Sequence, residues 1–355
     1  MLPINVNRCS DSDSILIELS SFLNTASNSL RKMPYYVCKI TQVGCNPVIG
    51  LVNLINYQDF HSKIIPHEHV YKDKINDYVQ QFITGNILNN PILLFYKNFS
   101  EFQHFISQLV HSLDQINVQC INGITYEIFP VNNCETVEML QNYLGKIPKF
   151  YIADGHHRIY ALSKIRAQST AAFSQHYLSF VVQEDDLKLG SFNRFIKGVN
   201  LNTEHFIKQL RQKYIIKQVS KEELNCETNV YIYTSDIWYQ LDLKKQAFSS
   251  KFTQVPSVHI DKFVISLLAS SSPLTSKVLY SPGTDRVDDI RQFHEKNQCQ
   301  VAINIPKISR HELFSITEEA CRLPPHSTYF TPKIPNDLFI QKLNLQPINM
   351  EDTLI

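Results

Sequence analysis

The stretch from residue 150 to residue 162 constrains the fold more than any other part of the chain. Residues 150–153 are apolar or aromatic, and a helical pattern of apolar residues occupies the end of the stretch. Between them lies a pentapeptide of polar and flexible residues, Asp154-Gly155-His156-His157-Arg158. This order predicts a strand that ends in a tight turn and leads into a helix. The chain must therefore contain both strands and helices.

The same turn is the first candidate site. Backbone N–H groups and the helix dipole favour anions at a helix N-terminus. Arg158 can form two parallel hydrogen bonds to phosphate oxygens, and Asp154 can bind a magnesium ion or accept a proton. The alternative is a capped helix start with solvated polar residues. The combination of these five residues favours a phosphate-binding site.

The composition limits the classes of function. Of 355 residues, 43% are hydrophobic and 19% are charged, and the formal net charge is +1. This predicts a soluble protein without a broad basic surface, so nucleic-acid binding is not expected. No segment approaches 18 consecutive apolar residues and no signal-peptide pattern is present, so no membrane span is expected. Eight cysteines without a CxxC pair indicate reduced thiols and predict a cytoplasmic protein.

Hydrophobic periodicity predicts helices and strands along the whole chain. Helices are expected over residues 13–31, 70–83, 99–113, 134–144, 203–214 and 310–320. Strands are expected over residues 35–40, 48–56, 91–96, 124–131, 177–182, 229–233, 237–243, 278–280 and 301–305. Mixed elements with long connections favour an α+β fold over an α/β fold. A polar segment at residues 183–190 predicts two domains, residues 1–185 and residues 186–355.

Glu68 is the second candidate, because it stands between two histidines directly before the helix predicted at residues 70–83. A glutamate at this place stabilises the helix dipole in any case. The flanking histidines favour a second interpretation, in which Glu68 is a general base. The His-Glu pairs of the chain lack the second histidine of zinc-protease spacing. A further alternative is a metal-dependent hydrolase with ligands from two turns: His67, His69, His156 and His157.

The segment of residues 324–333 is rich in proline and in hydroxyl groups. Ser327, Thr328 and Lys333 can contact an anion, although a stiff proline-rich segment with aromatic residues is as often a strap packed across a core. Arg194 is a weaker candidate for anion binding. No P-loop, G-x-S-x-G or G-x-G-x-x-G sequence occurs, which disfavours Walker ATPases, α/β-hydrolases and Rossmann dehydrogenases.

Several separated motifs together resemble the bacterial and archaeal family known as Domain of Unknown Function 1015. The matching stretches follow the family's order: residues 50–54, 66–68, 90–92, 152–158, 187–198 and 324–333. The chain departs from the family pattern in most of the N-terminal segment and at two single positions. Asn193 stands where a histidine is usual, and His326 stands where a lysine is usual.

The first half of the chain is also similar to the free serine kinases, which have a ParB/sulfiredoxin-like fold. This resemblance implies such a fold for residues 1–185, followed by a mixed α/β domain at residues 186–355. It implies catalytic roles for Glu68, Asp154 and His156, with Glu68 taking the proton of a substrate hydroxyl and Asp154 close to magnesium. Phosphate or nucleotide binding is expected from the turn and from later residues: Gly155, His157, Arg158, Arg194, Ser327, Thr328 and Lys333.

The resulting hypothesis is a kinase that uses ATP or ADP with Mg²⁺ and phosphorylates a hydroxyl group of serine or a serine-like metabolite. Its partners are then a nucleotide and a small hydroxyl-bearing substrate. Phosphoryl transfer needs positioning, charge neutralisation and a base, which these residue types can supply without a P-loop. One alternative is a nucleotide-binding regulatory protein of ParB type without turnover. The other is the metal-dependent hydrolase that uses the histidine cluster.

Overall fold

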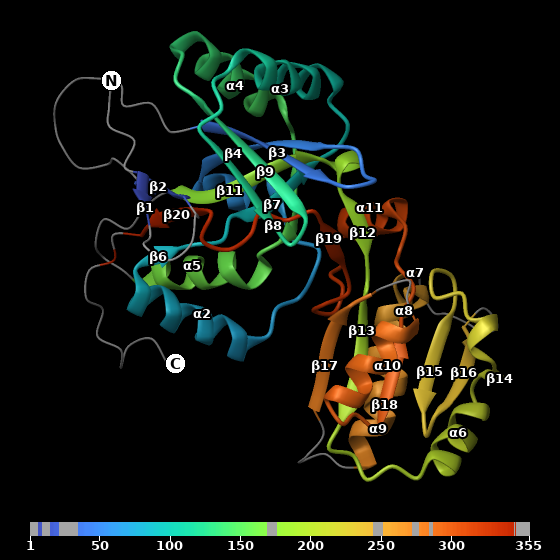
Figure 1. Ribbon diagram of the computed structural model, residues 1–355. Helices are drawn as coiled ribbons and strands as arrows, with labels where there is room; N and C mark the ends of the chain where they lie inside the picture. The colour runs from blue at the N-terminus through green and yellow to red at the C-terminus, as the bar shows by residue number, and fades with distance from the viewer. Residues whose placement is uncertain are drawn as a thin grey trace. The chain divides into compact units, whose positions relative to one another are not determined.

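The computed structural model describes residues 6–8, 15–20, 35–168, 176–243, 251–271, 277–283, 287–343 and 345. These residues form two compact units (Figure 1). Unit 1 contains the described residues up to Pro66, from Val70 to Lys188 and from Thr331 onward; unit 2 contains His67–His69 and the described residues from Leu189 to Phe330. The division into domains at residues 1–185 and 186–355 stays a prediction. The sequence did not indicate the return to unit 1 at Thr331.

Unit 1 is built on a mixed eight-stranded sheet in the order β5-β10-β7-β11-β4-β3-β9-β8. Its strands are β3 (Tyr35–Gln42), β4 (Val48–Asn56), β5 (Ile64–Ile65), β7 (Ile92–Tyr96), β8 (Asn117–Ile121), β9 (Ile124–Val131), β10 (Phe150–Asp154) and β11 (His176–Gln183). β7 pairs with β11 in parallel and with β10 antiparallel. All five residues of β7 are buried, as expected for an inner strand covered on both faces.

Four helices of unit 1 pack in two pairs against this sheet. The helices that the structure describes in unit 1 are α1 (Tyr57–Ser62), α2 (Lys72–Gly85), α3 (Ser100–Ser112), α4 (Cys134–Lys146) and α5 (His156–Gln168), with a 3-10 turn at Glu184–Asp186. α3 lies beside α4, where the rings of Phe102 and Tyr143 stack with 5.6 Å between their centroids. α2 packs against α5 (Figure 1). The second pair carries the turn at Asp154.

A second sheet of unit 1 corrects one prediction. Its four strands are ordered β1 (Val6–Arg8), β2 (Ile15–Ser20), β20 (Phe339–Lys342) and β6 (Ile87–Leu88). The helix expected over residues 13–31 is therefore wrong at residues 15–20, which pair with β20 in parallel; the rest of that range lies outside the described residues. Periodicity does not separate a short apolar run in a strand from one in a helix, and here the pairing with distant residues decides.

Unit 2 is built on an antiparallel six-stranded sheet. The strands, in order across the sheet, are β14 (Ile215–Val219), β16 (Ile237–Asp242), β15 (Val230–Thr234), β18 (Val301–Asn304), β13 (Phe192–Lys197) and β17 (Lys277–Pro282). A two-stranded sheet joins β12 (Lys188–Gly190) and β19 (Tyr329–Thr331). The sequence predicted four of the six strands, and β13 and β14 were not assigned.

Side chains alternate between two apolar layers on the faces of this sheet. Phe195 and Ala302 face a layer that includes Ile290, whereas Ile196 and Val301 face the other layer. The helical segments that the structure describes in unit 2 are α6 (Thr203–Arg211), a 3-10 turn (Lys221–Glu223), α7 (Lys251–Gln254), α8 (Pro256–His259), a π-helical turn (Ile260–Ile265), α9 (Ser266–Ser271), α10 (Val287–Lys296) and α11 (Arg310–Glu318). Both faces of the sheet are therefore covered, which gives unit 2 its own core.

The mixture of helices with mixed and antiparallel sheets agrees with the expected α+β class. The ParB/sulfiredoxin-like arrangement of residues 1–185 stays a prediction. Among the residues that the structure describes, no helix has both the length and the apolar character needed to cross a bilayer.

Candidate functional site

The predicted strand, turn and helix form around Asp154. β10 ends at Asp154, and α5 begins at His156. Gly155 joins them with a φ of 103°, a conformation that residues with a Cβ rarely adopt, and a Cβ here would lie 3.1 Å from Nη2 of Arg158. The first intrahelical bond runs from Ile159 N to Gly155 O (3.0 Å). It directs the N–H groups of the first turn out of the helix N-terminus.

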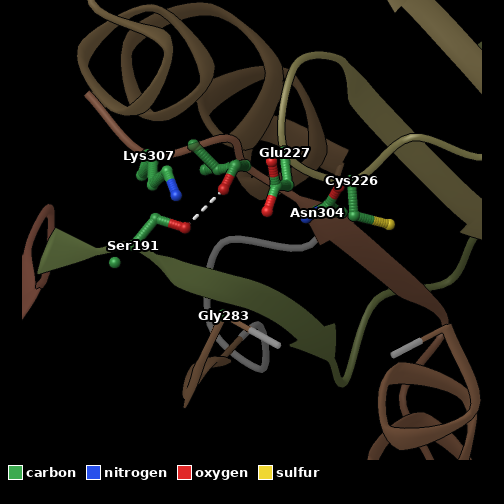
Figure 2. A pocket seen from close by; sticks show the side chains of 8 residues that line it. Ser191, Cys226, Glu227, Gly283, Asn304 and Lys307 are labelled. Carbon is green, nitrogen blue, oxygen red and sulfur yellow. Dashed lines mark hydrogen bonds between the residues drawn. The ribbon is translucent and has the colours of Figure 1, made fainter. Parts of the chain in front are cut away.

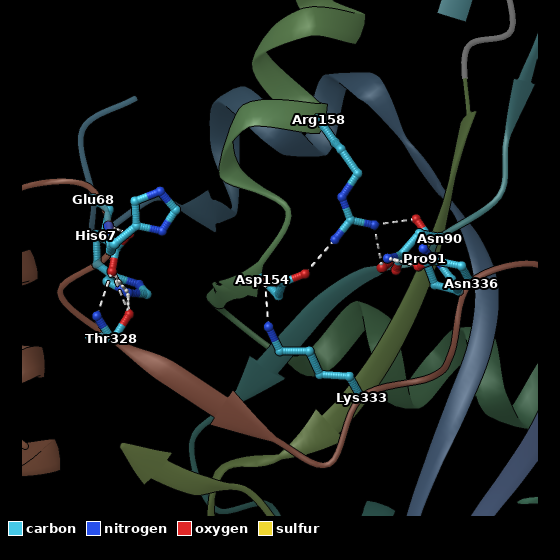
Figure 3. A network of polar contacts seen from close by, with 10 residues as sticks. His67, Glu68, Asn90, Pro91, Asp154, Arg158, Thr328, Lys333 and Asn336 are labelled. Carbon is cyan, nitrogen blue, oxygen red and sulfur yellow. Dashed lines mark hydrogen bonds and ion pairs between the residues drawn. The ribbon is translucent and has the colours of Figure 1, made fainter. Parts of the chain in front are cut away.

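Arg158 holds this turn in place (Figure 3). Its Nη2 donates to Oδ2 of Asp154 (2.5 Å), and its Nη1 donates to the carbonyl oxygens of Asn90 and Pro91, the latter at 3.1 Å. The residue is only 5% exposed. Arg158 thus clamps the turn against the residues that precede β7, and its expected bidentate contact with phosphate stays a prediction.

Lys333 supplies a second cation to the same carboxylate. Its Nζ lies 2.7 Å from Oδ1 of Asp154, and its carbonyl oxygen accepts a hydrogen bond from the hydroxyl of Tyr126 (3.3 Å). About a third of each side chain is exposed, 31% for Lys333 and 32% for Asp154. Burial alone would raise the pKa of Asp154, but the charges and hydrogen bonds of Arg158 and Lys333 outweigh it and hold the pKa below its ordinary value. Asp154 is therefore an anion at neutral pH.

The two histidines of the turn differ in what surrounds them. His156 is buried. Nε2 of His157 accepts a hydrogen bond from the backbone N–H of Tyr71 at the start of α2 (3.0 Å), and the two rings stack with 6.1 Å between centroids. Burial and the charge of Lys74 lower the pKa of His157 to about 4. A neutral His157 links the N-terminal ends of α2 and α5.

The cluster does not fit a magnesium site as it stands. Each carboxylate oxygen of Asp154 already bonds a cation, whereas magnesium needs oxygen ligands free to coordinate it. No group of three or more His, Cys, Asp and Glu side chains gathers at a metal-binding distance in the part of the chain that the structure describes. The histidine cluster of the hydrolase hypothesis is not found among these residues. Magnesium binding by Asp154 stays a prediction.

Glu68 lies in a second cluster, within unit 2 (Figure 3). Its Oε1 accepts from the backbone N–H groups of Ser327 (3.1 Å) and Thr328 (2.8 Å) and from the hydroxyl of Thr328 (2.6 Å). Its Oε2 accepts from the N–H of His326 (3.0 Å). Burial raises the pKa of Glu68 to about 7, although these hydrogen bonds and the charge of Arg194 oppose the shift.

Backbone bonds anchor Glu68 on both sides. The N–H of Leu323 donates to the carbonyl of His67, and the N–H of His69 donates to the carbonyl of Leu323, both at 2.8 Å. Nε2 of His67 lies 2.7 Å from the hydroxyl oxygen of Thr328. These backbone bonds do not involve the Glu68 carboxylate, so they hold the backbone on both sides of Glu68 even if the carboxylate moves.

Arg194 was expected to bind phosphate, and the structure buries it completely. Its Nε and Nη2 donate to the two carboxylate oxygens of Asp261, each at 3.1 Å, and its Nη1 donates to the carbonyls of Phe192 (2.7 Å) and His326 (2.8 Å). The guanidinium also lies 5.2 Å from the ring centroid of Tyr280. Arg194 thus supports the 326–328 segment through its hydrogen bond to the carbonyl of His326. A direct contact between Arg194 and a nucleotide stays a prediction.

A pocket in unit 2 contains no predicted site residue (Figure 2). It is lined by Gly190, Ser191, Cys226, Glu227, Gly283, Asn304, Ile305 and Lys307. The hydroxyl of Ser191 donates to the carbonyl of Ile305 (2.5 Å). The nearby Asn193, one of the two departures from the family pattern, is buried, and its Oδ1 accepts from Nδ2 of Asn304 (3.2 Å). Asn193 is therefore a packing residue here.

Four partners of the predicted residues carried no usable sequence signal. Asp261 lies on the π-helical turn, where no element was predicted. The carbonyls of Asn90 and Pro91 bind Arg158 through backbone atoms, which any residue type provides. Tyr71 contributes its backbone N–H to His157 for the same reason.

Residues 27–264 match the model of a protein family of unknown function, DUF1015. The match extends over more than half of the chain. The chain belongs to the DUF1015 family. The matched region includes Glu68, Asp154 and Arg194, whereas Ser327, Thr328 and Lys333 lie beyond it. No functionally curated protein matches this DUF1015 protein.

Solved structures that match this DUF1015 protein share little sequence with it. A free serine kinase mutant in complex with AMP has 13% identity and a TM-score of 0.45, with 80% of this chain and 91% of that chain covered. A conserved hypothetical protein from Pyrococcus furiosus has 13% identity and a TM-score of 0.45, with 80% and 92% covered. SbnI from Staphylococcus aureus, with a C-terminal truncation, has 12% identity and a TM-score of 0.43, with 80% and 85% covered. These similarities are too low to transfer a site or an activity.

Proposed function

We propose that this DUF1015 protein is a kinase that transfers a phosphoryl group from ATP or ADP to a hydroxyl group of serine or a serine-like metabolite. The observation that carries the proposal is the cluster at the start of α5, where Lys333 and Arg158 meet Asp154 beside a glycine-containing turn. Residues 1–185 then correspond to the ParB/sulfiredoxin-like domain implied by the resemblance to the free serine kinases.

The phosphate groups bind at the N-terminus of α5. Backbone N–H groups of the turn supply donors, and Lys333 supplies a partly exposed charge that can move from Asp154 to a phosphate oxygen. Gly155 lets the phosphate approach the backbone closely. Asp154, anionic at neutral pH, holds Lys333 in place before the nucleotide arrives.

Glu68 is the proposed base. A base works best with a pKa near the operating pH, and burial raises the pKa of Glu68 to about 7. The hydroxyl oxygen of the acceptor forms a bond to the terminal phosphorus of the nucleotide, and its proton passes to the Glu68 carboxylate. The bond between that phosphorus and the bridging oxygen breaks, and the electron pair stays on the shortened nucleotide.

A phosphorus NMR time course tests the proposal. The protein is mixed with magnesium, ATP or ADP, and a pool of hydroxyl-bearing metabolites that includes L-serine. A new phosphomonoester signal that is lost in Glu68→Gln establishes the kinase and identifies its acceptor. Nucleotide that is neither consumed nor bound, in a folded protein, rules the proposal out.

The second candidate is a nucleotide-binding regulatory protein without turnover. The four hydrogen bonds on the Glu68 carboxylate favour it, because donors of the protein itself already engage both of its oxygens. In the same experiment, nucleotide signals that broaden on binding without any new phosphomonoester support this function over the kinase.

A further inference from the structure

The donors around Glu68 form a site shaped for a carboxylate. Three consecutive backbone N–H groups and one hydroxyl, from His326, Ser327 and Thr328, converge on its two oxygens at 2.6–3.1 Å. Successive N–H groups that point into one concavity are a recurrent anion-binding arrangement in proteins. The sequence predicted an anion contact for Ser327 and Thr328, and in the structure that anion is a side chain of the protein itself.

Contacts other than those to Glu68 hold the 326–328 segment in shape. His326 has a φ of 59°, unusual for a residue with a Cβ, and its ring packs 4.5 Å from the ring of Tyr280 and 5.2 Å from that of Phe192 between centroids. Its carbonyl accepts from Arg194, and the hydroxyl of Ser327 donates to the carbonyl of Pro324 (2.7 Å). The donors therefore stay in position when the Glu68 carboxylate leaves them.

The local charge suits a carboxylate better than a phosphate. Arg194 is a cation that contacts the segment through the carbonyl of His326, and its guanidinium is already paired with both oxygens of Asp261. The groups that hydrogen-bond the Glu68 carboxylate are neutral N–H and O–H groups, and Nε2 of His67 lies 3.8 Å from its Oε1. They can satisfy the single charge and two oxygens of a carboxylate, whereas a phosphate dianion brings a second charge to a buried place.

We propose that residues 326–328 form a binding site for a small carboxylate, and that Glu68 occupies this site as an internal stand-in until the carboxylate of a substrate displaces it. This inference rests on the proposed function and adds substrate recognition to it. The acceptor's own carboxylate takes the four hydrogen bonds, and the Glu68 carboxylate, released from them, becomes available to the acceptor's hydroxyl. Binding of the correct acceptor thus prepares the base.

The exchange is energetically reasonable because the same four donors are satisfied before and after it. The backbone bonds between Leu323 and the residues on either side of Glu68 stay intact, so only a side chain has to move. The incoming ligand has to outcompete a tethered carboxylate, whose effective concentration is of the order of mM or more. Simple carboxylates should therefore bind weakly to the wild-type protein.

The test measures carboxylate binding without nucleotide and without turnover. Acetate and L-alanine, which has the carboxylate and amino group of serine but no hydroxyl to phosphorylate, are titrated against the backbone amide NMR signals of residues 326–328. In Glu68→Ala the internal competitor is absent, and an affinity at least about tenfold higher than in wild type is expected if Glu68 fills the site more than nine-tenths of the time. Glu68→Gln keeps a side chain in the site and should gain much less.

Two further variants keep the test decisive. Thr328→Val in the Glu68→Ala background removes one donor and should lower acetate affinity again. If Glu68→Ala does not fold, Glu68→Asp is used instead. It shortens the side chain by one methylene, so its carboxylate competes less strongly with acetate for residues 326–328. The inference is overturned if acetate and L-alanine shift none of these amides in any folded variant, or if inorganic phosphate binds there more tightly than acetate. Because no phosphoryl transfer is involved, failure here is distinguishable from failure of the kinase assay.

Discussion

Two carboxylates at the two candidate clusters illustrate how differently a fold can treat the same chemical group. Asp154 lies between the charges of Arg158 and Lys333, and its pKa is lowered. Glu68 is surrounded mainly by neutral donors in a buried place, and its pKa is raised to about 7. The two cations stabilise the charge of Asp154 in spite of its burial. The hydrogen bonds to Glu68 only partly offset the cost of desolvating its carboxylate.

This difference separates the expected roles of the clusters. Asp154 keeps its charge throughout the physiological range and can organise cations around a phosphate. Glu68 can gain or lose a proton near neutral pH, which is the property of a base or a switch. The comparison predicts that variants of the first cluster change binding and that variants of the second change chemistry.

The largest expected effect is on turnover in Glu68→Gln. Removing the base should lower the rate of phosphoryl transfer by about 10²- to 10⁴-fold, while nucleotide affinity stays within about twofold, because Glu68 is absent from the proposed phosphate cluster. Initial rates from phosphorus NMR and affinities from calorimetry check both values. If Glu68→Gln lost nucleotide affinity as strongly as it lost rate, the assignment of binding to the Asp154 cluster and of chemistry to Glu68 would be wrong.

The next effect is on stability as a function of pH. Because the folded pKa of Glu68 lies above its ordinary value of 4.5, the folded protein binds the extra proton more tightly. Its stabilising contribution is complete below pH 4.5 and is lost as the pH rises through about 7, for a total of about 3 kcal/mol. Urea unfolding between pH 4.5 and 8 measures it, and Glu68→Gln should lack this component of the slope. An equal slope in both proteins would contradict the raised pKa.

Lys333→Met should weaken nucleotide binding by roughly 10- to 100-fold, the value of one charge-assisted contact of about 1.5–3 kcal/mol. It should also raise the pKa of Asp154, since one of its two cations is removed. Lys149→Met, at an exposed lysine of the same unit, is the matched control. If both variants bind ATP and ADP as wild type does, Lys333 has no role in the phosphate site.

The smallest effect is structural and tests the turn itself. Gly155→Ala should destabilise unit 1 by about 1–3 kcal/mol, because its φ of 103° and the nearby guanidinium of Arg158 both oppose a Cβ. Gly145→Ala in α4, where nothing lies within 4 Å of the added carbon, should be neutral or stabilising by up to about 1 kcal/mol. Thermal unfolding of the pair measures the difference, and equal stabilities would show that the turn tolerates a Cβ.

Local pattern explains what the sequence could predict. The strand, the glycine turn and the helix around Asp154 are encoded within a dozen residues, and they form as expected. The strand at residues 15–20 was mistaken for a helix because one of its two partner strands, β20, lies more than 300 residues further along the chain. No local pattern reports such a pairing.

The two clusters show the same limit. Lys333 was a candidate anion contact, but its partner Asp154 lies 179 residues away. Phosphate binding by Ser327 and Thr328 stays a prediction, and the sequence alone could not identify Glu68, about 260 residues away, as the group that they contact. Residue type indicated the chemistry of these side chains, and the tertiary structure chose their partners.

The late return of the chain to unit 1 has a consequence for how the protein is made. Strand β20, which joins β2 to β6, and Lys333, which pairs with Asp154, are translated after all of unit 2. At typical speeds of 5–20 residues per second, a ribosome takes roughly 10–40 s to synthesise the residues between Asp154 and Lys333. During this interval β2 and β6 of the nascent unit 1 lack β20 between them, and Asp154 lacks its partner Lys333. Unit 1 therefore completes its sheet and its Asp154 cluster only after unit 2 has been synthesised, and folding factors that bind the emerging chain meet unit 1 in an unfinished state.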